Sequence, residues 1–198
     1  MTLKKQGITL LELLIAIGLL SVIVLGVSSI SIFSRHHAIN STVRSQLQAE
    51  IFLVIEHMNK RISRAIGNEF IDGDDMVVSL SEDASWKTIR VYIDTNDNGI
   101  RDDGANAWVC YRFDKTNFEM LFGEGCDTSC VCTGGTQVFT RGLIDDFTAT
   151  KPNDPGQLDH NNVTVAVTAC RDPAIAVSVD NPCESMESRI VMPSVSTN

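Results

Sequence analysis

The sequence predicts an α+β fold, in which a long N-terminal helix packs on an antiparallel β-sheet domain. Three observations predict it. An apolar run covers residues 8–34, helical periodicity continues to residue 66, and short segments rich in β-branched residues follow. A chain of 198 residues suits one domain with an anchor. We therefore expect a helix over 8–66 and a β-rich domain over 67–198.

The apolar run 8–34 predicts a membrane-spanning helix, because a bilayer needs about 20 apolar residues. Lysines at positions 4 and 5 precede the run, which favours a cytoplasmic N-terminus. An ordinary signal peptide has an apolar stretch of about 7–15 residues and a small-residue cleavage site, and the run fits neither. We expect a single-pass inner-membrane protein with its C-terminal domain in the periplasm.

Glu12 is the only ionisable side chain between Lys5 and Arg35. A carboxylate in a membrane helix costs at least about 2.5 kcal/mol, so such a residue usually has a partner and a function. The alternative is that Glu12 lies at the headgroup edge and reaches water or Lys5. Spacing alone leaves both interpretations open.

The segment 35–66 predicts an amphipathic continuation of the helix. Apolar residues recur there at steps of three or four, which is one helix face. They are Ile39, Val43, Leu47, Ile51, Ile55, Met58, Ile62 and Ile66. One helix over 8–66 would be about 90 Å long, and Gly67 is placed to cap its end. The stripe favours core packing under the globular domain over a coiled-coil partner.

Beyond Gly67 the sequence predicts eight short strands, because Val, Ile, Thr, Tyr and Phe are frequent in segments bounded by turn residues. The strands are expected at 76–80, 88–93, 107–113, 118–122, 136–140, 147–150, 163–168 and 190–192. In 88–93, apolar residues alternate with Thr88, Arg90 and Tyr92, as in a half-buried strand.

The loop that begins at Asp94 resembles the opening of a calcium loop, in which oxygen side chains alternate before a glycine. The candidate calcium ligands are Asp94, Asn96, Asn98, Ile100 and Asp102. Position 105, where a closing Glu would fall, is Ala. The alternative is a plain hairpin turn, because Asn98-Gly99 is a strong turn signal. Both interpretations stay open.

Six cysteines lie in the distal part: Cys110, Cys126, Cys130, Cys132, Cys170 and Cys183. An even number in an exported domain favours disulfides, although six cysteines allow fifteen pairings. We expect Cys170–Cys183 first, because that pair closes a short loop. The alternative is a metal site made by the other four in a reducing compartment, but their C-x3-C-x-C spacing is unusual for one.

The charge divides along the chain. Residues 1–66 hold seven basic and three acidic side chains, whereas residues 67–198 hold nine basic and twenty-two acidic ones, a net charge of −13. Nucleic-acid binding rests on basic side chains, so no nucleic-acid partner is expected. Nucleophile-elbow, Walker and dinucleotide-binding motifs are absent from the sequence. We therefore do not expect an enzyme.

Residues 4–17, KKQGITLLELLIAI, resemble the N-terminus of type IV prepilins and of the pseudopilins of type II secretion. A short basic leader, residues 1–7, ends at Gly7 in this resemblance. A hydrophobic residue, Ile8, follows it, then Thr9, and Glu12 becomes the fifth mature residue. The family usually has Phe where this chain has Ile8.

The resemblance implies a processing and assembly route. Prepilin peptidase would cut between Gly7 and Ile8 and methylate the new amine of Ile8. Glu12 would then pair with the N-terminal amine of a neighbouring pilin or pseudopilin, and Thr9 belongs to the same assembly motif. A buried carboxylate becomes tolerable when it is paired with a cation, and the pair would fix the axial register of the subunits.

The layout of the helix and the late strands is also similar to PilW-like minor pilins and J-type minor pseudopilins. This implies a structural subunit that primes, or joins, a pilus or a secretion pseudopilus. One alternative is a membrane-anchored exported domain that binds calcium or a ligand without any filament. Another is a DNA-uptake pilin, which the acidity of residues 67–198 disfavours.

Overall fold

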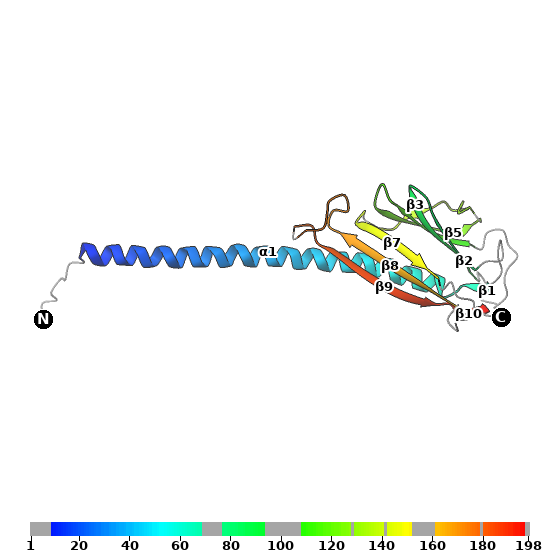
Figure 1. Ribbon diagram of the computed structural model, residues 1–198, viewed down its shortest axis with the longest axis horizontal. Coiled ribbons are helices and arrows are strands. Elements are labelled where there is room, and N and C mark those ends of the chain that lie inside the picture. Colours follow the sequence, from blue (N-terminus) through cyan, green and yellow to red (C-terminus); the bar gives the residue numbers. More distant parts are fainter. Residues whose placement is uncertain are drawn as a thin grey trace. The chain divides into compact units, whose positions relative to one another are not determined.

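The computed structural model describes residues 9–68, 77–93, 108–127, 129–140, 142–151, 161–178 and 180–196. The chain divides into two compact units, 1–42 and 43–198. A single helix, α1 (Leu10–Ile62), begins in the first unit and ends in the second. In the second unit the helix packs against antiparallel sheets (Figure 1), so the predicted α+β class is confirmed.

In the first unit the described chain is the N-terminal part of α1. The helix continues without interruption through Gly18 and Gly26, the points where the sequence is weakest. It is long and apolar enough to cross a membrane. Its most apolar window of 18 residues has a mean hydropathy of 2.7, and none of that window is buried within the protein.

The described residues of the second unit form three sheets. The described strands are β1 (Ile66–Asn68), β2 (Val78–Glu82), β3 (Trp86–Tyr92), β4 (Trp108–Asp114), β5 (Glu119–Cys126), β6 (Gln137–Val138), β7 (Ile144–Thr150), β8 (Asn162–Cys170), β9 (Cys183–Val191) and β10 (Ser194–Ser196). One antiparallel sheet has the order β2-β3-β4-β5-β6, and another has the order β7-β8-β9. The third is a parallel pair of β1 and β10.

The core of the second unit forms where one face of α1 meets the two larger sheets. From Leu47 to Ile62 the predicted apolar stripe is buried, and Val54, which the stripe omitted, is buried with it. These side chains share one cluster with residues such as Tyr111 and Phe147 of the sheets. The expected core packing of this part of the helix is therefore confirmed.

The helix ends at Ile62, four residues earlier than predicted. The amides of Arg64 and Ala65 donate to the carbonyls three residues before them, which tightens the final turn. Ile66 then begins β1 and is 4% exposed, in a second cluster with Tyr92 and Trp108. Gly67 therefore lies in a strand and is not the predicted helix cap, because the sheet offers this segment a partner in β10.

All eight predicted strand segments overlap observed strands, but β9 is much longer than predicted. Its first six residues, CESMES, contain little that signals a strand, and most of its side chains are partly or fully exposed. A strand at the edge of a sheet can be polar, since only one neighbouring strand pairs with it.

In β3, Ile89 and Val91 are buried, as the alternation predicted, and Tyr92 is buried in the second cluster.

Two leucines on α1, one buried and one partly exposed, test which face of the helix stabilises the second unit. Leu47 is 1% exposed and Leu53 is 46% exposed. We expect Leu47→Ala to lower the free energy of unfolding by about 2–5 kcal/mol, because it leaves a cavity in the core. Leu53→Ala should change it by less than about 0.5 kcal/mol. Denaturant unfolding of the detergent-solubilised chain measures both, and equal losses would contradict this account of the core.

Candidate functional site

Thr9 forms the N-cap of α1. Its side-chain Oγ1 accepts a hydrogen bond from the amide of Glu12 at 3.3 Å. Its carbonyl oxygen accepts from the amides of Glu12 at 3.1 Å and Leu13 at 3.2 Å. The bonds from Glu12 satisfy an amide that has no i→i−4 partner in the helix, and the bond from Leu13 is the first i→i−4 bond of α1. The T-x-x-E pattern, Thr9 to Glu12, is the sequence signal of a capping box, and it places the helix start here.

Glu12 lies in the first turn of α1, and its side chain is exposed. The N-terminal end of a helix carries a partial positive charge, which favours a carboxylate at this position. Gly7 and Ile8, the predicted processing residues, lie outside the described residues. The structure therefore places Thr9 and Glu12 at the start of the helix, two and five residues after the predicted leader.

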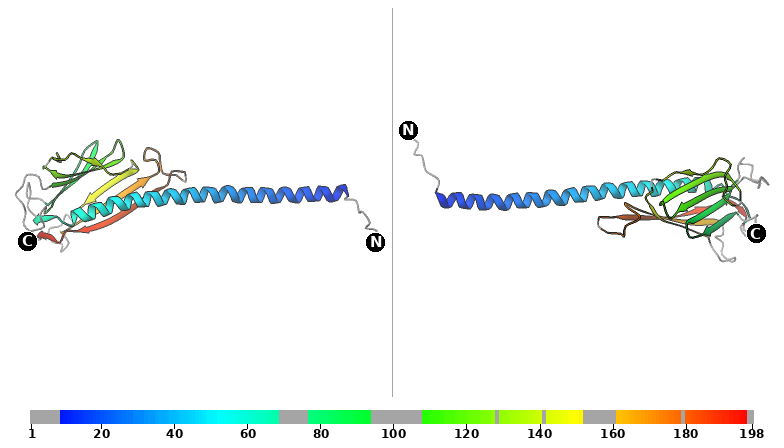
Figure 2. Two further views of the ribbon diagram at one scale, coloured as in Figure 1. Left: turned by 180° about the vertical axis from the view of Figure 1, so that it is seen from behind. Right: turned by 90° about the horizontal axis from the view of Figure 1, so that it is seen from above.

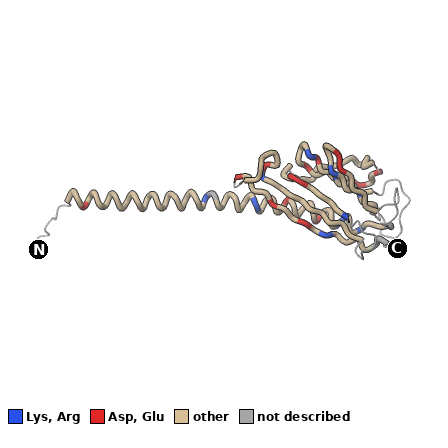
Figure 3. Tube along the Cα trace, viewed as in Figure 1, with Lys and Arg blue, Asp and Glu red and all other residues tan. Residues whose placement is uncertain are grey.

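The surface that follows Glu12 is apolar on every side. Leu10 is 79% exposed, Leu14 62% and Phe33 70%, so apolar side chains point outward around the helix. Within residues 9–42 the charged side chains are Glu12 and Arg35. The corresponding stretch of the tube in Figure 3 is mostly tan, the colour of residues other than Lys, Arg, Asp and Glu. Such a surface is stable when lipid or apolar protein covers it.

Two serine hydroxyls on this apolar surface, those of Ser21 and Ser29, are bonded inside the helix. Ser21 donates to the carbonyl oxygen of Ile17 at 2.8 Å, and Ser29 donates to that of Leu25 at 2.9 Å. Serines bonded in this way add little polarity to a helix in lipid. Among residues 9–34 the carboxylate of Glu12 is thus the polar group that most needs a partner from outside its own helix.

Residues 2–28 match the family model of the prokaryotic N-terminal methylation motif. The match covers the basic leader, Gly7, Ile8, the cap at Thr9, Glu12 and the first part of the apolar helix. The N-terminus is that of a type IV prepilin-like protein. Neither the curated proteins nor the solved structures that were searched contain a match to this chain.

The matched motif supports a type IV prepilin-like precursor, a class of protein that prepilin peptidase processes. The long apolar helix fits membrane anchoring by length and composition. The individual roles of Gly7, Ile8, Thr9 and Glu12 in cutting, methylation and assembly stay predictions, as does the subtype of pilin.

The distal unit of this prepilin-like chain is cross-linked by three disulfides, which confirms the disulfide interpretation of the cysteines. Cys170 is bonded to Cys183, the pair expected first, and it joins the end of β8 to the start of β9. The other two bonds are Cys110–Cys130 and Cys126–Cys132. No cysteine of the chain is free.

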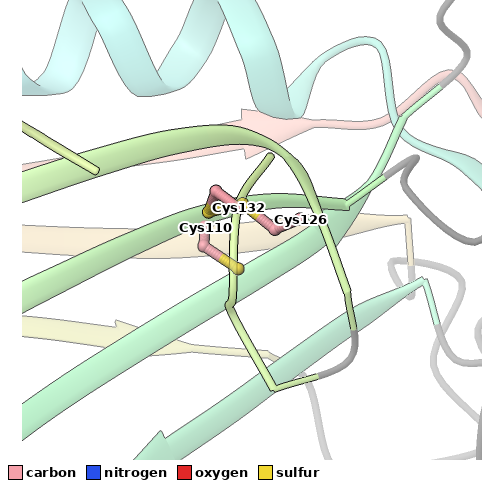
Figure 4. Close-up of side chains that lie close together, drawn as sticks. All are labelled: Cys110, Cys126 and Cys132. Atoms are coloured by element: carbon pink, nitrogen blue, oxygen red, sulfur yellow. A yellow bond between two sulfur atoms is a disulfide. The ribbon is translucent and has the colours of Figure 1, made fainter. Parts of the chain in front are cut away.

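The two remaining disulfides lie close together on β4, β5 and the loop that follows β5 (Figure 4). The sulfurs of Cys110, Cys126 and Cys132 are within 4.8 Å of one another. A metal would need these residues as thiolates, but all of them are oxidised to disulfides. The alternative of a four-cysteine metal site is therefore wrong for this oxidised structure.

The candidate calcium ligands Asp94, Asn96, Asn98, Ile100 and Asp102 lie outside the described residues, so the calcium interpretation stays a prediction.

His57 on α1 has a hydrogen-bonding partner in the sheet that no sequence motif indicates. Its Nδ1 lies 2.9 Å from the hydroxyl oxygen of Tyr111 on β4. The Tyr111 hydroxyl donates to the backbone carbonyl of His57, so this pair links the helix to the sheet.

Gly123 on β5 tests the packing of the paired disulfides. A Cβ at this position would overlap Cys132 Sγ and lie 3.2 Å from Cys126 Sγ. We expect Gly123→Ala to prevent the Cys126–Cys132 bond and to leave two free thiols, which alkylation and peptide mass spectrometry detect. Gly134→Ala is the matched control, because a Cβ there meets nothing within 4 Å. A full set of three disulfides in Gly123→Ala would contradict the geometry.

His57 predicts a pH dependence of stability. Burial lowers the pKa of His57 most, and the nearby Arg61 lowers it further; Glu124 raises this pKa by less than Arg61 lowers it, and Lys60 has the smallest lowering effect. The unfolded chain therefore binds more protons than the folded one as pH falls below about 6.5. This contribution to stability is present above about pH 6.5 and is lost as pH falls through that value towards the lowered pKa.

We accordingly expect the free energy of unfolding to fall less steeply between pH 7 and pH 5 in His57→Gln than in the wild-type chain. His37→Gln is the control, because His37 is exposed on α1. Denaturant unfolding at several pH values measures the slopes, and identical slopes in His57→Gln and the wild type would refute the assignment.

Proposed function

We propose that this chain is a minor type IV pilin-like structural subunit. It is cut between Gly7 and Ile8, methylated on Ile8, and assembled through α1 into a pilus or a type II secretion pseudopilus, where it primes assembly. The observation that carries the proposal is the position of Glu12. Its carboxylate lies in the first turn of α1, inside the matched methylation motif, and the rest of the helix up to Ser34 carries no charge.

The physical argument concerns the free energy of the carboxylate in an apolar environment. A lone charge in lipid or in a filament core is unfavourable, and a cation beside it removes most of that penalty. Cutting after Gly7 creates such a cation, because it frees the amine of Ile8. The rest of the helix to Ser34 is uncharged and its serines at 21 and 29 are bonded internally. The pair of amine and carboxylate would therefore set the register of neighbouring helices.

The distal unit supports an exported orientation. Disulfides persist in oxidising compartments such as the periplasm and are rare in the cytosol. Three of them cross-link residues 110–183. Lysines 4 and 5 favour a cytoplasmic leader. The leader and the disulfides therefore both support a cytoplasmic N-terminus and an exported distal unit. A domain of net charge −13 beyond residue 66 is suited to an aqueous exterior, and nucleic acid is not an expected partner.

Glu12→Gln tests the role of the carboxylate at nearly constant shape. We expect the variant to insert into membranes but to be absent from sheared filaments, because the register-setting charge pair cannot form. Glu56→Gln is the matched control, since Glu56 is an exposed glutamate on the same helix. It should incorporate normally. Normal incorporation of Glu12→Gln would refute the register role.

The same preparation tests processing. The intact mass of the wild-type chain from cells with the peptidase should correspond to loss of residues 1–7 and gain of one methyl group on Ile8. A membrane-bound chain that still begins at Met1 would contradict the proposal. That result would favour the alternative of an anchored, exported binding domain that joins no filament.

A further inference from the structure

The loop between β8 and β9, residues 171–182, exposes four consecutive apolar residues at its tip. They are Ala174, Ile175, Ala176 and Val177, and all four are exposed. Ile175 is 58% exposed and Val177 is 70% exposed. Scattered apolar residues on a surface need no explanation, but a run of four in an exposed loop indicates a binding surface. We call these four residues the apolar tip.

The apolar tip is held firmly in place by the loop beneath it. The Cys170–Cys183 disulfide closes the base of the loop. Asn181, which is 5% exposed, fills its centre. The Asn181 side-chain Nδ2 donates to the carbonyl oxygens of Asp172 at 2.9 Å and Ile175 at 2.8 Å, and its Oδ1 accepts from the Asp172 amide at 2.8 Å. The loop therefore presents its apolar side chains outward although its own interior is polar and ordered.

The loop lies at the end of the second unit where α1 enters it. Glu184, just after the loop, forms an ion pair with Arg44 at 3.3 Å and accepts a hydrogen bond from Gln48 at 3.5 Å. The opposite end of the unit holds the β1–β10 pair, after α1 has ended. Figure 2 shows this loop, drawn in brown, on the side of the second unit from which α1 emerges.

This position keeps the apolar tip within reach of the bilayer. Nine residues, 35–43, connect the apolar run to the start of the second unit. Even a fully extended chain of nine residues spans at most about 32 Å. Whatever the orientation of the two units, Val43 at the start of the second unit stays within this distance of the end of the apolar run.

We propose that the apolar tip inserts into the periplasmic surface of the lipid bilayer while the subunit is stored before assembly. The tip is exposed and aliphatic, which suits a deformable lipid surface. Tethering raises the effective concentration of lipid, so a contact that is weak by itself suffices. The inference rests on the exported, membrane-anchored orientation of the proposed function, and it does not require the charge pair at Glu12.

Photocrosslinking in vesicles tests the proposal with the full-length chain. The photoreactive residue p-benzoylphenylalanine replaces Val177 in one variant and Val131 in the control. Val131 is 68% exposed, and its neighbour Cys130 belongs to the cluster of Ile66 at the opposite end of the unit. The vesicles contain phosphatidylethanolamine and phosphatidylglycerol only. After illumination, intact mass spectrometry counts chains that carry one phospholipid, and thiol assays verify the three disulfides.

We expect about tenfold more lipid adduct at position 177 than at position 131, a modest ratio for a tethered contact. Adding Ile175→Asp to the position-177 variant should reduce the adduct to the level at position 131. Equal adducts at the two positions would overturn the proposal, and so would an adduct to a second protein chain in place of lipid. Because these vesicles contain no peptidase and no other pilin, failure here is distinguishable from failure of processing or filament incorporation.

Discussion

The burial of one face of α1 is the constraint on which the second unit depends. Leu47, Ile51, Met58 and Ile62 form a stripe that both larger sheets cover. Each of these sheets has one face that water would otherwise solvate, and α1 shares one buried cluster with both of them. The same helix carries apolar side chains on all sides before residue 35. The change from an all-round apolar surface to a single stripe divides α1 into a first part that is long and apolar enough to cross a membrane and a second part that packs in the protein core.

Disulfides stabilise the parts of the second unit that the apolar core does not reach. Cys170–Cys183 fastens the β8–β9 hairpin at one end of the unit. Cys110–Cys130 and Cys126–Cys132 lie with Ile66, Tyr92 and Trp108 in the second cluster, where the chain leaves α1. Disulfides restrict the unfolded chain, by about 3 kcal/mol for a loop of about 15 residues. The cross-links and the core therefore stabilise different regions.

Local sequence patterns predict the structure correctly where residues close together in the sequence determine it. The stripe on α1 and the alternation in β3 both identified buried side chains, because burial of one face imposes a period on the sequence. The β1–β10 pair was missed because it joins segments more than a hundred residues apart and each strand has three residues. β9 was predicted too short because an edge strand tolerates polar side chains. The pairing of four clustered cysteines depends on the β4–β5 register, which no local pattern reveals.

At the N-terminal site, the residue that caps α1 lies next to the amine that the proposed cut would free. The cap at Thr9 starts the helix immediately after Ile8, so in the proposed mature chain the free amine lies one residue before the cap. That amine adds a full positive charge to the partly positive end of the helix, which is unfavourable by itself in an apolar environment. Glu12 lies within the same first turn and cannot relieve a second subunit's amine unless the helices align. Under the proposed function, neutralisation of this cation by the Glu12 carboxylate of a neighbouring subunit would require a defined axial stagger between the two helices.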